Sequence, residues 1–126
     1  MRAVLDTSVF VAREQRGLVP DRQLRGCVSS VTLCELALGV DMAPDPDVRA
    51  VRSHTLITVE ETLEVLDVTR AVPRRFGSIM GAQRRRGLRP SMQDTLIAAT
   101  ALEHELPIVT QDVDFLAFDS LEVILV

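Results

Sequence analysis

Apolar and polar segments alternate along this chain in a way that predicts strands separated by helices. Short apolar runs predict strands at residues 3–5, 27–29, 63–68, 108–109 and 123–125. Apolar residues at helical spacing predict helices at residues 9–11, 30–40, 46–59, 72–86 and 91–105. Strands that alternate with helices indicate an α/β fold, and we expect a three-layer α/β/α sandwich with a mostly parallel central sheet.

Capping and breaking residues are expected to bound these elements. Ser30 should cap the second helix, and Pro44 and Pro46 should open the third. Gly87 should close the fourth helix at a C-cap position. The polar residues 13–25 predict a loop. The second helix should bury one face, formed by Leu33, Leu36, Ala37 and Val40.

Length and composition indicate one globular domain. The chain has 126 residues, and we expect residues 1–126 to form a single domain with one ordinary core. Hydrophobic residues make up 47% and charged residues 25%, which argues against disorder. The net charge of −4 does not exclude a nucleic-acid partner, because the distribution of charge matters more than its sum. Lysine is absent, which excludes any mechanism that needs a catalytic lysine.

The sequence favours a soluble protein of the cytoplasm. Cys27 and Cys34 lack the spacing of a zinc site, and we expect two buried free thiols. The first apolar run is short and broken by Asp6, so no signal peptide is expected. No apolar run approaches the roughly 18 to 20 residues that a membrane span needs, so we expect no membrane partner.

Four acidic residues stand at positions where a folded protein rarely places them without a reason. Asp6 and Asp112 each follow a predicted strand, and Asp94 takes the third position of a predicted helix. Each has a structural interpretation, since Asp6 and Asp112 could cap helices and Ser91 with Asp94 fits a capping box. Glu35 is harder to explain, because a carboxylate near an apolar helix face has to be paired, neutralised or bound to metal.

Together these acids predict a metal site. Ligands of open parallel sheets bind at the carboxyl ends of strands, where Asp6 and Asp112 stand and the helix of Asp94 begins. Two carboxylates about 5 Å apart repel by about 3 kcal/mol at an effective dielectric constant near 20. Mg²⁺ or Mn²⁺, which prefer oxygen ligands, would relieve this repulsion. No zinc site competes, because His54 and His104 are isolated and expected at the surface. We therefore expect a metal-dependent phosphodiesterase.

Four sequence blocks surround the acids in order. They are VLDTS at residues 4–8, SVTLCELALG at 30–39, DTLIAATA at 94–101 and TQDVDF at 110–115. In these blocks the chain resembles the PIN-domain nucleases and, more narrowly, the VapC-type toxins of bacterial toxin–antitoxin pairs. The resemblance runs from residue 2 to the C-terminus. One block alone is a weak signal, whereas four in order at this total length are a strong one.

The resemblance implies a PIN-like fold and a Mg²⁺- or Mn²⁺-dependent endoribonuclease. The metal ligands that it implies are Asp6, Glu35, Asp94 and Asp112. Asp114 would be a fifth acid that acts through a water, or a structural partner near Phe115. Thr7 or Ser8 would support the site through hydroxyl hydrogen bonds. A metal-activated water would attack the phosphodiester in line and leave 5′-phosphate and 3′-hydroxyl ends.

A basic segment precedes Asp94 in the sequence. Half of all Arg residues lie between Val68 and Asp94, with no acid among them. One interpretation is a solvated helix face. The other is a surface that follows RNA phosphates towards Asp94, which would make binding fall with salt. In that interpretation Arg86 and Arg89 are the expected RNA-binding residues, because they stand nearest the acid in sequence.

Alternative functions fit less well or differ in kind. A haloacid-dehalogenase-type phosphatase needs a second acid where this chain has Ser8, and a receiver domain needs a lysine. Two rivals remain, namely a non-catalytic interaction module on the same fold and a housekeeping RNA-processing nuclease. The presence of all four acids argues against the first, and the short chain favours a toxin over the second.

The toxin interpretation carries partners by analogy. They are a cognate antitoxin, an RNA substrate and a second copy of the chain, with a higher assembly that includes the antitoxin. Apolar helices at residues 9–11 and 33–59 would offer a groove for an antitoxin helix. An Arg or Lys of that antitoxin could enter the acidic site and block it. Apolar helix surface left over on a small domain favours the homodimer.

Overall fold

The computed structural model describes residues 1–16 and 23–126. In this part of the chain a sheet of five strands has the order β3-β2-β1-β4-β5, and every neighbouring pair is parallel. The strands are β1 (Arg2–Leu5), β2 (Arg25–Ser29), β3 (Glu64–Leu66), β4 (Ile108–Thr110) and β5 (Val123–Leu125). The helices are α1 (Thr7–Arg16), α2 (Ser30–Asp41), α3 (Pro46–Thr62), α4 (Ala71–Arg85) and α5 (Met92–Glu103), and a 3₁₀ helix, η1, spans Val113–Ala117.

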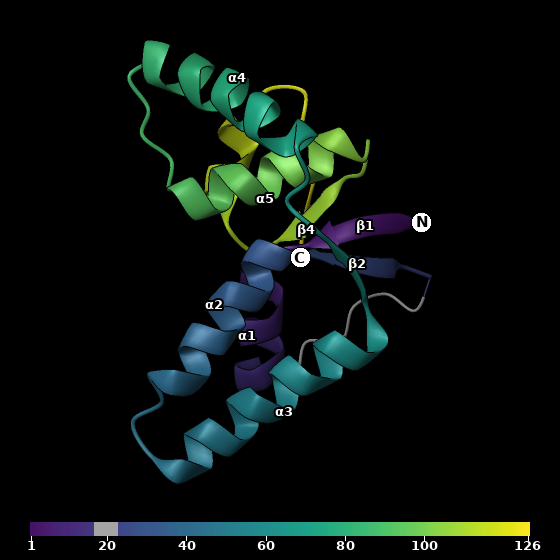
Figure 1. Cartoon of the computed structure of the whole chain (residues 1–126), viewed down its shortest axis with the longest axis vertical. Helices are drawn as coiled ribbons and strands as arrows, with labels where there is room; N and C mark the ends of the chain where they lie inside the picture. The colour runs from purple at the N-terminus through teal and green to yellow at the C-terminus, as the bar shows by residue number, and fades with distance from the viewer. Residues whose placement is uncertain (17–22) are drawn as a thin grey trace.

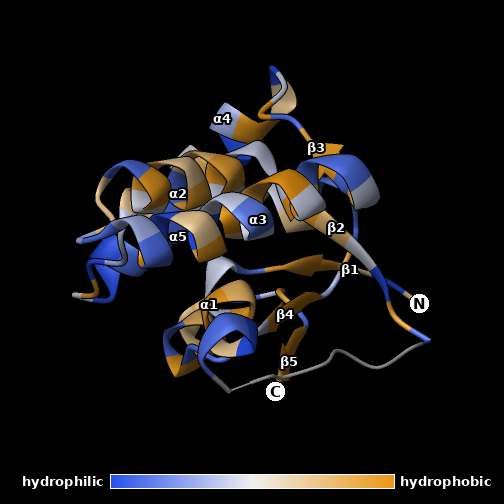
Figure 2. Ribbon diagram, turned by 90° about the horizontal axis from the view of Figure 1, so that it is seen from below, coloured by the Kyte–Doolittle hydropathy of each residue, from blue (hydrophilic) through white to orange (hydrophobic). Residues whose placement is uncertain are grey.

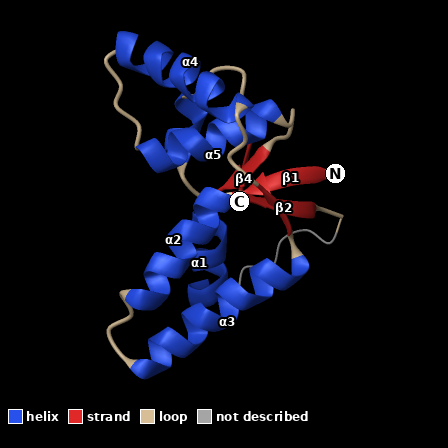
Figure 3. Ribbon diagram, viewed as in Figure 1, coloured by secondary structure: helices blue, strands red, loops and turns tan. Residues whose placement is uncertain are grey.

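The sheet lies between two layers of helices (Figure 1; Figure 3). Helices α1, α2 and α3 cover one face, where Phe10, Leu36 and Val59 join a buried cluster with strand residues. Helix α5 covers the other face and α4 packs on the outer side of α5; Ile97 of α5 joins a second cluster, against which Ile79 of α4 packs. The predicted three-layer α/β/α sandwich is confirmed, and the described sheet is parallel throughout rather than mostly parallel.

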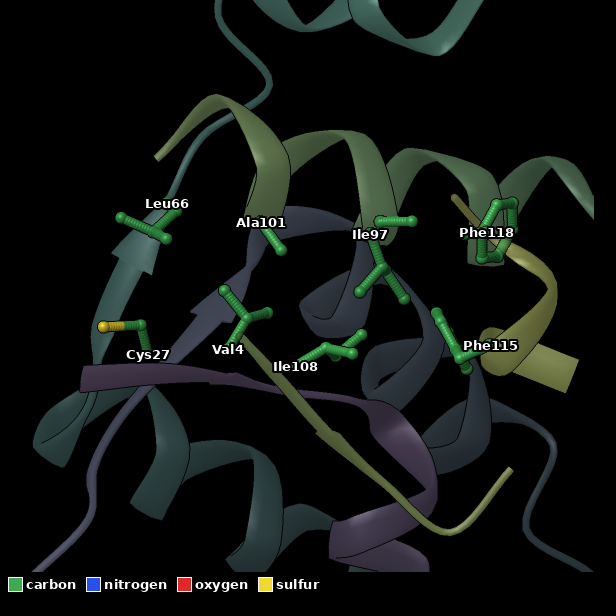
Figure 4. Packing of buried hydrophobic residues seen from close by; sticks show 9 residues of the cluster. Val4, Cys27, Leu66, Ile97, Ala101, Ile108, Phe115 and Phe118 are labelled. Carbon is green, nitrogen blue, oxygen red and sulfur yellow. The ribbon is translucent and has the colours of Figure 1, made fainter. Parts of the chain in front are cut away.

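Successive residues of each strand belong to different cores, because their side chains point alternately to the two faces of the sheet. One core receives Val4, Cys27, Leu66 and Ile108 (Figure 4). The other receives Ala3, Leu5, Val28 and Val109. Since helices cover both faces, the strands are apolar on both sides, as their colouring in Figure 2 shows. This explains why the sequence shows short apolar runs at these strands.

The strand order creates a switch point between β1 and β4. From β1 the chain moves to β2 and then β3 on one side, and it returns through α4 and α5 to β4 on the other side. Ligands of open α/β sheets bind at such a reversal, outside the carboxyl ends of the strands. The backbone N–H of Asp6 donates to the carbonyl of Val109 over 2.9 Å, so the ends of β1 and β4 lie side by side.

The first helix is longer than the sequence indicated. We expected a helix only around residues 9–11 and a loop over residues 13–25, but α1 continues through Arg16 and β2 begins at Arg25. Residues 13–16 are Arg, Glu, Gln and Arg. The prediction of a loop rested only on their polarity, but all four are good helix formers and can continue the helix. The expectation for residues 17–22 lies outside the described residues.

The second helix has a different cap from the one expected, and only one of the two prolines expected to open the third helix lies in it. Ser29, not Ser30, caps α2, because its hydroxyl accepts the N–H of Val31 over 3.1 Å. Asp45 caps α3, so Pro46 is the first helical residue and Pro44 lies outside. Ser29 and Asp45 act as caps because their backbone is extended, which lets each side chain turn back and accept an N–H of the first helical turn.

The buried face of α2 was only partly predicted. Leu36 is buried as expected, but Ala37 is exposed and Thr32 is buried instead. Cys34 is exposed, so the expectation of two buried thiols is wrong for this residue, whereas Cys27 is buried and free. The buried face differs from the predicted one because α2 is rotated so that Thr32 and Leu36 point inward. Apolar character alone does not determine this rotation.

The later elements agree with the sequence. Gly87 has a positive φ of 79° directly after the C-cap of α4, a conformation that glycine adopts without strain. Ser91 caps α5, and β5 has the expected bounds. The strand expected over residues 63–68 is shorter, with three residues paired. No helix within the described ranges is both long and apolar enough to cross a bilayer.

Candidate active site

Asp6 is the most buried acid at the carboxyl edge of the sheet, with 4% of its surface exposed. Its Oδ2 accepts hydrogen bonds from the hydroxyls of Ser8 over 2.8 Å and Thr110 over 2.9 Å. No hydrogen bond reaches its Oδ1 from the described residues. Every fully buried polar side-chain atom in that part of the chain has a partner, so Oδ1 is open to solvent. One oxygen is therefore fixed and the other is available to a ligand.

Thr110 joins the ends of β1 and β4. Its hydroxyl donates to Asp6 and accepts the backbone N–H of Asp112 over 2.9 Å, and the residue is fully buried. Ser8 completes this connection, because its hydroxyl accepts the N–H of Gln111 over 3.0 Å. The hydroxyls thus hold the two acid-bearing turns in one arrangement. Sequence reasoning missed Thr110, although its place two residues before Asp112 at a strand end could have indicated it.

Glu35 comes from the first turns of α2 and is half-buried. The Thr7 hydroxyl donates to its Oε1 over 2.8 Å, and Thr7 also contacts the Thr32 hydroxyl over 3.3 Å. Burial raises the pKa of Glu35 above its ordinary value, the Thr7 hydrogen bond lowers it, and the charge of Asp6 raises it. The sequence left open whether Thr7 or Ser8 supports the site; each supports a different acid.

Asp94 is the third residue of α5. Its backbone N–H donates to the hydroxyl of the N-cap Ser91 over 3.0 Å, which confirms the predicted capping arrangement. Burial, together with the charges of Asp6, Asp112 and Glu35, raises the pKa of Asp94 to about 6, against a hydrogen bond from Ser91 that lowers it. All three other predicted acids thus act on this one carboxyl group.

Asp112 has a structural role as well as a place in this group. Its Oδ1 accepts the N–H of Asp114 over 2.9 Å, so it caps the 3₁₀ helix η1. The carboxylate of Asp114 is exposed, and its charge is not among those that raise the pKa of Asp94 or Glu35. The structure therefore brings four of the five acids into electrostatic contact and leaves the fifth, Asp114, outside.

The donor set of these four acids fits a hard divalent cation. Their hydrogen bonds come from hydroxyls and backbone N–H groups, and none of the ion pairs found in the described part involves them. Carboxylate oxygens are the ligands that Mg²⁺ and Mn²⁺ prefer. As the side chains stand, no three acids, His or Cys within residues 1–16 and 23–126 are close enough to hold an ion. Ligation would need side-chain rotations that draw the carboxylates together.

The two arginines expected to bind RNA differ in their surroundings. The guanidinium of Arg86 donates to the carbonyl of Ala117 over 3.1 Å and lies 3.8 Å from Asp119, so it is fastened to the segment after η1. Arg89 is exposed and has no partner among the described residues. A fastened guanidinium has to give up these contacts before it binds a phosphate, which favours Arg89 over Arg86.

Two depressions mark the surface formed by α1, α2 and α3, and one of them reaches an acid of the site. A cleft of about 210 Å³ reaches Glu35 and is lined by Thr7, Leu36 and Arg52 among others. A larger groove of about 460 Å³ lies between α1 and α3, with Phe10, Val51 and Val59 on its walls. Both lie on the side of the sheet that α1, α2 and α3 cover. The sequence had indicated this surface as a groove.

The chain is similar to known proteins in sequence and in structure. A family model described as PIN domain matches residues 3–121. The chain is 39% identical over 125 residues to Ribonuclease VapC4 of Mycobacterium tuberculosis (strain ATCC 25618 / H37Rv). The matched residues make up 98% of this chain and 95% of that protein. The chain is 40% identical over 121 residues to Ribonuclease VapC5 of the same strain, with 92% of this chain and 87% of that protein covered.

Solved structures agree with the sequence comparison. The crystal structure of VapBC-5, a member of the VapBC family of toxin–antitoxin systems from Mycobacterium tuberculosis, superposes with a TM-score of 0.86 and 38% identity, over 99% of this chain and 98% of that one. VapBC2 from Rickettsia felis, bound to a DNA fragment from its promoter, has a TM-score of 0.84 at 22% identity, over 98% of both chains. The second likeness shows the fold alone.

Proposed function

This chain belongs to the PIN-domain family and, within it, to the VapC ribonucleases, and from that premise we propose that it is the toxin of a toxin–antitoxin pair and cuts RNA with a divalent metal ion. The observation that carries the metal-dependent activity is the coupling of Asp94 to Asp6, Asp112 and Glu35 at the switch point of the sheet. Three carboxylate charges act on Asp94 at one edge of the sheet, and a bound cation would offset their repulsion.

The proposed ligands of the ion are Asp6, Glu35, Asp94 and Asp112, with Asp114 as a fifth acid that acts through a water. A divalent ion in this site supplies Lewis-acid polarisation of a phosphoryl oxygen and lowers the pKa of a water. Asp6 offers its Oδ1, because Ser8 and Thr110 hold its Oδ2. Glu35 offers Oε2, because Thr7 holds Oε1, and this free oxygen is suited to align the attacking water.

The hydroxyl groups act as positioning residues. Thr110 and Ser8 fix the carboxylate plane of Asp6 relative to Asp112, and Thr7 fixes Glu35 relative to the start of α1. Such support matters because ligand oxygens must be held close to their working geometry. Attack on the phosphodiester in line with the departing 3′-oxygen then leaves a 5′-phosphate and a 3′-hydroxyl.

The chemistry of the new RNA ends tests this proposal. RNA incubated with the purified protein and Mg²⁺ or Mn²⁺ is expected to gain 5′-phosphates, which allow direct adaptor ligation, and 3′-hydroxyls, which allow tailing. Ends of the opposite kind, a 5′-hydroxyl with a cyclic phosphate, would mean that the ribose 2′-hydroxyl is the nucleophile and would contradict the metal-activated water. No cutting at all would favour a non-catalytic module on this fold. A target confined to one precursor RNA would favour a housekeeping processing nuclease.

The groove between α1 and α3 is the proposed docking site of the cognate antitoxin. The chain's structural neighbours include VapBC complexes of toxin and antitoxin. The groove has apolar walls from Phe10, Val51 and Val59, and the cleft beside it leads to Glu35. An amphipathic helix in the groove could therefore send a cationic side chain towards the acids and inhibit the site. A homodimer, joined by antitoxin into a higher assembly in the cytoplasm, completes the proposal.

One helix supplies a matched pair of variants for the antitoxin site. Val51 lines the groove with 53% of its surface exposed, whereas Ile57 is 51% exposed on the same helix and does not line it. Val51→Asp is expected to weaken binding of the co-expressed antitoxin at least about tenfold by calorimetry. Ile57→Asp is the control. Equal losses in both variants would place the antitoxin elsewhere.

A further inference from the structure

Helix α4 carries a concentration of positive charge that the carboxylate site does not explain. Residues 68–93 contain seven Arg and no Asp or Glu, although the whole chain has a net charge of −4. The other residues therefore hold all eighteen acids against seven Arg. α4 lies on the outer side of α5, away from the sheet (Figure 1). Its exposed side is a cationic surface on an otherwise acidic protein.

The contacts of these arginines divide them into two kinds. Arg75 lies 3.3 Å from Glu103, and Arg86 is bound to Ala117 and Asp119, so both serve the packing of α4. Arg70, Arg74, Arg84, Arg85 and Arg89 are exposed, and none has a partner among the described residues. Their charges are uncompensated within the described structure and are free for an anionic ligand.

Three of the free arginines lie along one stripe of the helix. At 100° per residue, Arg74 and Arg85 are about 20° apart around the axis and about 16 Å apart along it, and Arg70 continues the stripe beyond Arg74. Gly77, Ser78 and Gly81 lie at or beside the stripe between Arg74 and Arg85, where the helix has almost no side chains. We call Arg70, Arg74 and Arg85 with these three small residues the arginine stripe.

The two glycines are not needed for packing. A Cβ at Gly77 would have no heavy atom within 4 Å, and one at Gly81 would meet only the Arg85 guanidinium at 3.3 Å. Glycine within a helix is less favourable than alanine. The Arg85 guanidinium lies over Gly81, so it is the surface around Gly77 that leaves room for the backbone of a ligand while the flanking guanidinium groups bind its charges.

The chemistry of the stripe favours a phosphodiester chain over a protein partner. None of the large exposed hydrophobic residues lies within α4, whereas protein interfaces depend on apolar and aromatic anchors. Arginine forks match phosphate oxygens, and a regular cationic row follows a backbone without reading sequence. The loop after α4 carries the free Arg89 and connects the Arg85 end of the stripe to α5, whose third residue is Asp94.

We propose that the arginine stripe of α4 binds single-stranded RNA phosphates and guides the strand over the α4–α5 loop to the carboxylate site. This inference rests on the proposed function. It differs from the sequence-based expectation, which emphasised Arg86 and Arg89, because Arg74 and Arg85 become the principal contacts and Arg86 keeps α4 in place. The stripe contributes affinity and not the chemical step.

The test compares two doubly substituted proteins of equal charge. Arg74→Ala with Arg85→Ala removes the stripe, and Arg25→Ala with Arg49→Ala removes two exposed arginines from β2 and α3. Binding of a labelled single-stranded RNA of mixed sequence is measured by fluorescence anisotropy in EDTA, at several salt concentrations, with electrophoresis to verify that the RNA stays intact. Thermal unfolding verifies that each variant folds.

The stripe variant is expected to bind about twentyfold more weakly at about 0.1 M salt, because each lost phosphate contact removes about 0.7 from the slope of log affinity against log salt. The control should lose less than about twofold. Gly77→Gln should keep or raise the melting temperature and yet weaken RNA binding, because its side chain fills the room around Gly77. Equal losses in both double variants, or unchanged affinity in the stripe variant, would overturn the proposal.

The measurement separates this proposal from the nuclease proposal. Binding in EDTA needs no cleavage, so it decides the role of the stripe even if no metal produces cutting. If cutting occurs, the stripe variant should have a raised KM and an unchanged kcat. If the stripe variant loses antitoxin or self-association while RNA affinity is retained, the surface serves a protein and the proposal is wrong.

Discussion

Asp6 shows how a buried carboxylate is held in place by neutral donors. Two hydroxyls donate to the same oxygen, Oδ2, and both come from residues at the edge of the sheet, Ser8 and Thr110. Neutral donors fix the orientation of a carboxylate without placing a cation beside it. A salt bridge would have cancelled the charge and filled the ligand position. The hydroxyl support therefore leaves Asp6 available for a cation.

Thr110→Val tests this support at the scale of one hydroxyl. The replacement keeps the shape but removes the hydrogen bonds to Asp6 and from Asp112, so we expect a loss of about 1–3 kcal/mol in unfolding free energy and a weaker affinity for Mn²⁺. Thr100→Val is the control, because its buried hydroxyl contacts only the Leu96 carbonyl. Denaturant unfolding and Mn²⁺ calorimetry measure the two effects. If both variants bind Mn²⁺ like the parent, Thr110 does not position the site.

The raised pKa of Asp94 leads to a prediction of how the stability of the metal-free protein depends on pH. Its pKa is about 6 in the folded chain and has an ordinary value of 3.8, so the folded state holds this proton more tightly than the unfolded state. Raising the pH from about 4 to about 6 therefore favours unfolding, and this contribution is fully unfavourable above pH 6. In EDTA, Asp94→Asn is expected to be more stable than the parent at pH 7 and to vary less over this range.

The control for this prediction is Glu60→Gln, which removes one exposed carboxylate of α3. Melting temperatures of the three proteins across the pH range make the comparison. Parallel curves for the parent and Asp94→Asn would show that the repulsion at the sheet edge is absent, and would remove the main support for the metal site.

At the scale of elements, two side chains at the C-terminal end of α4 fasten the helix to Ala117, the last residue of η1. Gln83, only 2% exposed, donates to the Ala117 carbonyl over 2.9 Å, and Arg86 donates to the same oxygen. The acceptor is therefore satisfied twice. This attachment keeps α4 beside α5 and so fixes the arginine stripe relative to Asp94.

The shared acceptor predicts a non-additive loss. Gln83→Met should cost about 1 kcal/mol, because Arg86 still satisfies the Ala117 carbonyl. Gln83→Met with Arg86→Met should cost more than the sum of the single changes, because the carbonyl then has no partner. Gln93→Met, at an exposed position of α5, is the control. Urea unfolding provides the free energies, and a strictly additive result would show that the two donors act independently.

Elements with buried apolar residues could be predicted from the sequence, and those bounded by polar residues could not. The strands and α5 agree because both sheet faces are covered, so their apolar runs are unambiguous. The extent of α1 was missed because its last turn is polar, and polarity does not separate an exposed helix from a loop. The cap of α2 was displaced to Ser29 because two serines adjoin and only the backbone geometry decides between them.

The candidate site was predictable in its acids but not in its support. Strand ends and an isolated glutamate in an apolar segment indicated Asp6, Glu35 and Asp112. The bond from Thr110 to Asp6 joins residues 104 apart in the chain, and it exists only because β1 and β4 are neighbours. That adjacency depends on strand order, which local patterns do not determine.

At the scale of the whole molecule, charge is separated in space. Four coupled acids occupy the switch point of the sheet, while the free arginines lie on the outer face of α4. An RNA strand can therefore meet cationic contacts before it reaches the acids, whose own field would repel it. The central claim is that these acids hold a divalent ion and that RNA is cut there.

The measurement that tests this claim most directly is cleavage of total cellular RNA by the purified, antitoxin-free protein in Mg²⁺, Mn²⁺ or EDTA. The parent and Glu60→Gln should give the same discrete products with either metal and none in EDTA. Asp6→Asn and Asp94→Asn should lose at least about a hundredfold in rate while remaining folded. Cleavage that persists in EDTA, or in both variants, would contradict the account.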